Sequence, residues 1–170
     1  MLLKLMGAIM VVASCSGFGI LMAFTYKREV RSLDALLRIL EWMINDLRFK
    51  MTPLPELCRI SAGFGDSTLR SFFLKMEREM NKHTSPDAAS CASAALSSTV
   101  NISPELQEIL KQLGCSLGQF DAEGQIQCLE SVRLVTEDRK SVLCKNMSNR
   151  LRSYQTLGLC AGAALAILLV

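Results

Sequence analysis

The sequence predicts an all-α protein of about six helices, in which two long helices pair antiparallel as a stalk beside a small helical bundle. Three observations support this prediction. No window alternates apolar and polar residues at period two over the length of a strand. Long stretches instead repeat apolar residues at three-and-four spacing. Proline follows a hydroxyl residue at three places, which is the order typical of helix starts.

The first long helix is predicted over residues 5–50. From Lys27 to Lys50 the chain contains no Pro or Gly, and no breaker separates this stretch from the apolar residues before it. At 1.5 Å per residue such a helix is about 70 Å long. Its apolar stripe consists of Val30, Leu33, Leu36, Leu37, Leu40, Met43, Ile44 and Leu47.

The last long helix is predicted from Asp121 to the end of the chain, because no proline occurs after that residue. Its stripe consists of Ile126, Leu129, Val132, Val135, Val142, Leu143, Met147, Leu151 and Tyr154.

Shorter helices are predicted between these two. Thr52-Pro53, Ser85-Pro86 and Ser103-Pro104 each place a capping hydroxyl before proline, and Asp66 is a fourth candidate cap. Gly63 to Gly65 and Asn81 to Thr84 are predicted to be loops. The segment 88–95 is rich in Ala and Ser, so we expect it to pack closely against a neighbouring helix.

Both ends of the chain are apolar. Residues 5–26 and residues 153–170 carry no formal charge, and an apolar helix of roughly 20 residues spans a bilayer core about 30 Å thick. The sequence therefore predicts three parts: a transmembrane helix at 5–26, an all-helical domain at 27–152 and a C-terminal transmembrane helix at 153–170.

The flanking charges predict the orientation. Ten basic residues of the domain follow the first apolar run or precede the second, whereas only Lys4 and the amino terminus lie outside. Cytoplasmic segments carry such an excess of Lys and Arg. We therefore expect a cell-membrane protein with two spans and a cytoplasmic domain. The ten residues are Lys27, Arg28, Arg31, Arg38, Arg133, Arg139, Lys140, Lys145, Arg150 and Arg152.

One alternative concerns the amino terminus. Val12-Ala13-Ser14-Cys15 resembles a lipoprotein processing site, which would make the domain an exported one. The apolar run continues past Cys15 to Phe24, however, and this favours a retained anchor.

Small residues recur at four-residue spacing in both predicted spans. Such residues let helix backbones approach closely in lipid. We expect a helix contact there, either within the chain or between the chains of a homo-oligomer. The residues are Ala13, Gly17, Gly158, Gly162 and Ala166.

The sequence offers no catalytic, metal or cofactor site. His83 is the single histidine, and the seven cysteines include no CxxC pair. No phosphate-binding glycine loop is present, and no basic stripe interleaved with aromatics indicates nucleic-acid binding. We expect neither an enzyme nor a nucleic-acid-binding protein.

A docking surface is the remaining prediction. Thr52, Pro53, Leu54, Pro55 and Glu56 follow the first long helix, and two prolines in a first turn make a rigid, partly apolar corner. These five residues either only end one helix and start the next, or they form a surface on which a partner docks.

Two stretches carry a family resemblance. They are Met51-Thr52-Pro53-Leu54-Pro55-Glu56 and Leu113-Gly114-Cys115-Ser116-Leu117-Gly118, the latter followed by Asp121, Gln125 and Leu129. With the two apolar ends, this order resembles stage III sporulation protein AB of endospore-forming bacteria. In physical terms, Gly118 ends one helix and Asp121 caps the next.

The resemblance implies a function. That family is related to the inner-membrane platform protein of type II secretion and type IV pilus systems. It implies a platform subunit of a sporulation complex between mother cell and forespore, with the domain on the mother-cell side. The implied partners are the cytoplasmic secretion-type ATPase of the complex and its other membrane subunits. A membrane-anchored helical sensor that binds a small ligand is the alternative from another functional class.

Overall fold

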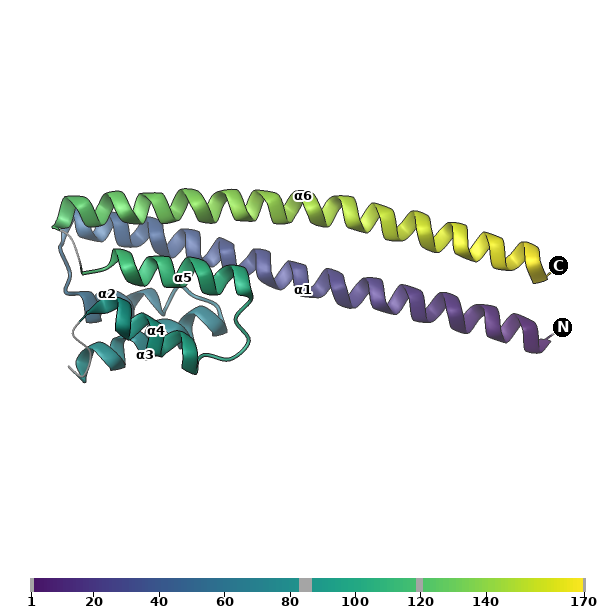
Figure 1. Cartoon of the computed structure of the whole chain (residues 1–170), viewed down its shortest axis with the longest axis horizontal. Helices are drawn as coiled ribbons and strands as arrows, with labels where there is room; N and C mark the ends of the chain where they lie inside the picture. Colours follow the sequence, from purple (N-terminus) through teal and green to yellow (C-terminus); the bar gives the residue numbers. More distant parts are fainter. Residues whose placement is uncertain (1, 83–86, 119–120, 170) are drawn as a thin grey trace. The chain divides into compact units, whose positions relative to one another are not determined.

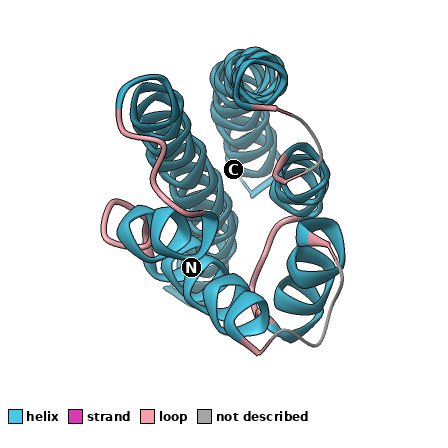
Figure 2. Cartoon of the chain, turned by 90° about the vertical axis from the view of Figure 1, so that its left-hand side faces the viewer, coloured by secondary structure: helices cyan, strands magenta, loops and turns pink. Residues whose placement is uncertain are grey.

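Six α-helices form the part of the chain that the structure describes, residues 2–82, 87–118 and 121–169 (Figure 1). This computed structural model describes side chains from Tyr26 to Asn146 within those ranges. The helices are α1 (Leu2–Phe49), α2 (Leu54–Ser61), α3 (Ser67–Asn81), α4 (Ala88–Ser98), α5 (Pro104–Ser116) and α6 (Ala122–Leu169). No strand occurs among these residues (Figure 2). The all-α prediction with six helices is confirmed.

The two long helices are continuous where the sequence predicts them. Both α1 and α6 contain 48 residues, and neither breaks near residue 27 or 152. The chain divides into two compact units: unit 1 comprises residues 1–30 and 141–170, and unit 2 comprises residues 31–140. Each long helix therefore supplies residues to both units.

Unit 2 contains the apolar core that positions the candidate site. The stripe predicted on α1 is buried at six of its eight positions, and Val30 and Leu37 are half-buried. Phe72 and Phe73 of α3 are fully buried and meet edge to face, with ring centroids 5.2 Å apart. Helix α2 packs on α3, α3 on α4 and α4 on α5. Burial of these side chains is the main stabilising contribution.

Ion pairs fix the antiparallel register of α1 and α6 within unit 2. Lys140 Nζ lies 2.6 Å from Asp34 Oδ1, and Arg48 lies 3.4 Å from Glu130. As the numbering rises along α1 it falls along α6, so the two helices run in opposite directions. The predicted antiparallel pairing is present at this level of the chain.

Helix α6 buries only part of the apolar stripe that the sequence predicts. Val135 and Val142 are exposed, whereas Gln125 and Thr136 are buried with Leu129 and Val132. The buried face thus follows spacings of four, three and four residues but includes two polar side chains. Thr136 satisfies its hydroxyl by donating to the Val132 carbonyl at 2.7 Å, so its burial leaves no polar group unpaired.

The predicted helix caps are confirmed in part. Asp66 accepts from the Leu69 N–H, Ser103 from the Leu106 N–H, and Asp121 from the Gly124 N–H, at 2.9, 3.3 and 3.1 Å. Ser85-Pro86 lies outside the described residues, and α4 begins after Asp87. Asn81, predicted to be in a loop, is the last residue of α3.

The predicted close approach of the small-residue segment is confirmed. Ala92 of α4 meets Gly114 of α5 so closely that a Cβ placed on Gly114 would lie 2.2 Å from the Ala92 Cβ. No pair of larger residues fits at that separation. A small residue is thus required at Ala92 by the contact with α5.

Candidate functional site

The end of α1 is built around the buried carboxylate of Asp46. The backbone N–H groups of Lys50 and Met51 both donate to the Asp46 carbonyl, at 2.7 and 3.0 Å. The Thr52 N–H then donates to the Asp46 carboxylate at 3.2 Å. One residue therefore satisfies three N–H groups of the segment that follows the helix, and this fixes the direction in which the chain leaves α1.

Met51 has a backbone conformation that few large residues adopt. Its φ is +54°, in the left-handed region, where an L side chain costs roughly 1–2 kcal/mol relative to the right-handed region. Such outliers persist only where the surrounding hydrogen bonds enforce them. Here the enforcing hydrogen bonds are those to Asp46.

The predicted cap at Thr52 is wrong. Helix α2 has Pro53 as its N-cap residue, and no side chain caps it. The Pro53 carbonyl accepts from the Leu57 N–H at 2.9 Å. Thr52 instead contributes its own N–H to Asp46, so its position is determined by the end of α1 and not by the start of α2.

The five predicted docking residues differ in exposure. Pro53 and Glu56 are exposed, whereas Thr52, Leu54 and Pro55 are half-buried. Glu56 is engaged by Arg59 one turn later, at 3.2 Å. Leu54 is turned toward the bundle, so the residues that face solvent are only part of the predicted set.

Two neighbouring apolar side chains are far more exposed. Phe49 is 79% exposed and Met51 is 67% exposed, and they flank Lys50 at the end of α1. We call Phe49, Met51 and Pro53 the corner surface. Isolated exposed apolar residues are common. Here two large ones lie two residues apart, and Met51 also has the positive φ, which makes the corner surface the candidate docking surface.

The corner also joins the two stretches that carry the family resemblance. Gly118, in the turn after α5, has a φ of +79°, and a Cβ placed on it would lie 3.6 Å from Leu54 and 3.5 Å from Ala88. The positive φ favours glycine and confirms that Gly118 ends a helix. Stretches more than 50 residues apart in the sequence thus meet behind the corner surface.

A second aromatic contact lies on α1 near the corner. The Trp42 ring lies 5.6 Å from Phe64, which belongs to the predicted loop between α2 and α3. Phe64 remains 49% exposed. Trp42 and Phe49 are seven residues apart and therefore project from the same side of α1. The contact between Trp42 and Phe64 holds the Gly63–Gly65 loop against α1.

Sequence reasoning missed Asp46 and Phe49. Asp46 lies three residues after Met43 and so falls on the buried face of α1, where an acidic residue is unexpected. That position is the signal that could have identified it as a buried acceptor. Phe49 lies outside the apolar stripe of α1, and a large apolar residue off that stripe is the signal that could have identified it as exposed.

The buried Cys58 thiol of α2 is unreactive at neutral pH. Burial, assisted by the nearby Glu77 and Cys91, raises the pKa of the Cys58 thiol to about 12. A thiol with that pKa stays protonated at neutral pH and is a poor nucleophile. Among the residues whose side chains are described, no group of three His, Cys, Asp or Glu residues could hold a metal ion. His83 lies outside the described residues.

The predicted spans are only partly described. Ala13, Gly17, Gly158, Gly162 and Ala166 lie within α1 and α6, but their side chains are outside the described set, as are those of 5–25 and 153–170. Within the described residues, no helical segment combines the length and the apolar character that a membrane crossing requires.

Comparison with known proteins gives two matches. The family model of stage III sporulation protein AB matches residues 4–170. A solved structure titled stage III sporulation protein AB is similar in fold, with a TM-score of 0.60 and 18% sequence identity, over 69% of this chain and 94% of that chain. A search of curated protein sequences gives no match.

Proposed function

Because this chain belongs to the stage III sporulation protein AB family, we propose that it is a membrane-anchored platform subunit of a sporulation complex, which docks the complex's cytoplasmic secretion-type ATPase. The corner surface carries this proposal. It offers exposed apolar side chains on a backbone that Asp46 holds in one conformation. A preorganised surface of this kind loses little entropy when a partner binds.

The proposed topology has spans at 5–26 and 153–170, with residues 27–152 on the cytoplasmic, mother-cell side. The uncharged runs and the ten flanking basic residues support it. The continuity of α1 and α6 supports it further, because each apolar run then belongs to a helix that also supplies residues to unit 2.

The proposed role is coupling and not catalysis. Each of the two long helices supplies residues to both units. Coupling would therefore run along unbroken helix, so that an event at the corner surface reaches the other membrane subunits. The small residues Gly158, Gly162 and Ala166 are the proposed contact with those subunits or with a second copy.

Two experiments test this function. Protease added to intact cells that express the protein should leave the domain uncut, whereas an exported lipoprotein would be digested. In the second experiment, the full-length protein in lipid nanodiscs should retain the ATPase on an affinity column. Failure to retain it, with the protein shown to be folded, would rule out the docking role.

A further inference from the structure

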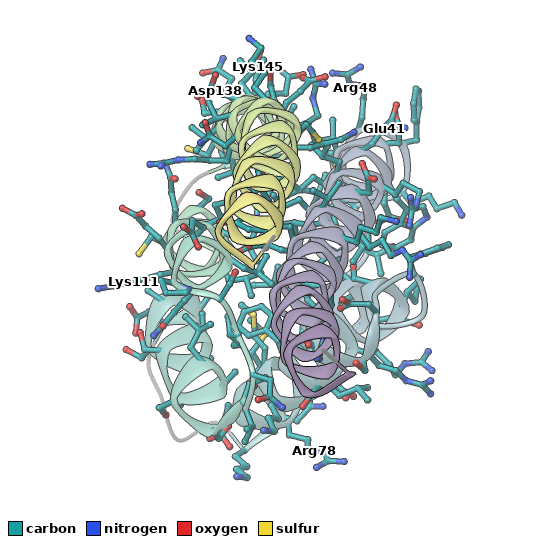
Figure 3. The ribbon with its side chains drawn as sticks, turned by 90° about the vertical axis from the view of Figure 1, so that its right-hand side faces the viewer. Glu41, Arg48, Arg78, Lys111, Asp138 and Lys145 are labelled. Carbon is teal, nitrogen blue, oxygen red and sulfur yellow. The ribbon has the colours of Figure 1, made fainter. Side chains whose placement is uncertain are left out.

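Unit 1 has a net positive charge in its sequence, and part of that charge lies on its described surface. Lys27 and Arg28 of α1 and Lys145 of α6 are all exposed, and Lys145 points outward in Figure 3. The sequence of unit 1 contains one acidic residue, Glu29, which is half-buried. We call Lys27, Arg28 and Lys145 the basic collar.

The charge continues toward the second apolar run. Arg150 and Arg152 follow Lys145 in the sequence, and no acidic residue occurs after Asp138. In the first segment Lys27 and Arg28 directly follow the uncharged run that ends at Tyr26. Basic residues are therefore concentrated next to the apolar runs in both segments of unit 1.

The tyrosines mark the same boundary. The chain has two, Tyr26 and Tyr154. Each lies within two residues of the point where an uncharged run meets a basic one. Tyrosine is enriched at the level of the lipid headgroups, because its ring is apolar and its hydroxyl is polar. A tyrosine and basic residues thus lie together in the sequence at the edge of each apolar run.

We propose that the basic collar binds the headgroups of anionic phospholipids in the cytoplasmic leaflet. This inference rests on the proposed membrane topology and adds a ligand to it. Each Lys or Arg near an anionic membrane surface strengthens attraction by about 1 kcal/mol, which is roughly fivefold in an association constant. The collar then holds unit 1 at a fixed depth and recruits acidic lipid around the protein.

The test uses full-length protein in bilayers that contain spin-labelled phosphatidylglycerol or phosphatidylcholine. The fraction of each labelled lipid immobilised by the protein gives a relative association constant. We expect wild-type protein to prefer phosphatidylglycerol about fivefold in low salt, and this preference to fall near one in about 1 M NaCl, where the Debye length is about 3 Å.

Matched variants assign the preference to the collar. The collar variant is K27Q/R28Q/K145Q, which we expect to lower the preference severalfold. The control is R70Q/R78Q/K111Q, which removes three exposed basic residues of unit 2, two of them labelled on its outer surface in Figure 3. The control should keep the wild-type preference. Inorganic phosphate at constant ionic strength should not compete.

The outcomes are distinguishable. Equal association of the two lipids with wild-type protein, equal effects of the two triple variants, or competition by inorganic phosphate would each overturn the collar proposal. A protein that immobilises neither lipid and is extracted by alkaline carbonate would instead overturn the proposed membrane topology.

Discussion

The Asp46 carboxylate accepts the Thr52 N–H at 3.2 Å, and this hydrogen bond spans the connection between α1 and α2. The backbone carbonyl of the same residue accepts two further N–H groups, so the corner surface rests on both the main chain and the side chain of Asp46. The corner is therefore both a structural joint and, by our proposal, the docking site.

Replacing Asp46 should loosen the corner. Asp46→Ala leaves the Thr52 N–H without its acceptor and should destabilise unit 2 by about 1–3 kcal/mol. Asp46→Asn retains an acceptor oxygen and should cost less. Denaturation can be followed by the fluorescence of Trp42, the single tryptophan. Equal stability of wild type and Asp46→Ala would show that the hydrogen bond does not hold the corner.

Replacement of Met51 by glycine should relieve backbone strain while it weakens binding of the ATPase. Met51→Gly relieves the strain of the positive φ, so it should be about 1 kcal/mol more stable than Met51→Ala. Both variants remove the exposed side chain and should bind the ATPase more weakly than wild type. If the glycine variant is no more stable than the alanine variant, the positive φ of Met51 does not strain the backbone.

A residue larger than glycine at position 114 should destabilise the contact between α4 and α5. Gly114→Ala places a methyl group against Ala92 and should destabilise the bundle by about 1–3 kcal/mol. Ala92→Gly removes the facing methyl group, so the double variant should recover part of that loss. A double-mutant cycle with no coupling would contradict the close approach.

Cys58 should make stability fall at high pH. Its pKa is about 12 in the folded protein and 9.0 ordinarily, so between those values the unfolded thiol has lost a proton that the folded one keeps. Its contribution is therefore fully present below pH 9 and is lost as the pH rises toward 12. Cys58→Ala should flatten the decline of unfolding free energy over that range; an unchanged slope would contradict the assignment.

Cysteine labelling tests the same interior by another route. Cys115 is exposed, whereas Cys58 and Cys91 are buried. A maleimide reagent at neutral pH should modify Cys115 quickly and leave the two buried thiols unmodified until the protein unfolds. Mass spectrometry of the digested protein identifies the sites. Rapid modification of Cys58 would show that the core behind the corner opens readily.

Much of the fold follows from local sequence signals. Apolar periodicity located α1 and α6, and Asp66, Ser103 and Asp121 marked helix starts, because capping depends on only three or four adjacent residues. The face of α6 was less predictable. Thr136 lies on the same face as Leu129 and Val132 and is buried there, and its hydroxyl bonds within the helix, so its burial leaves no polar group unpaired. Apolar character alone predicts that Val135 is buried, whereas its polar neighbour Thr136 is the buried residue.

The candidate site was predictable only in outline. The two prolines identified a corner, but exposure depends on which side chains the rest of the bundle covers. Half-buried Leu54 lies close to Gly118, which is more than 60 residues later in the sequence. Phe49 and Met51 are left outside. Which of the corner residues are covered and which are exposed depends on long-range contacts, and residue spacing does not give those contacts.

The most direct test of the docking claim is the dissociation constant of the ATPase for full-length protein in nanodiscs. Phe49→Ser should weaken binding at least tenfold, the loss expected when a buried aromatic anchor is removed. Val100→Ser is the matched control, because Val100 is 76% exposed in the turn between α4 and α5, and it should leave the constant unchanged. Equal constants for Phe49→Ser and wild type would contradict docking at the corner surface.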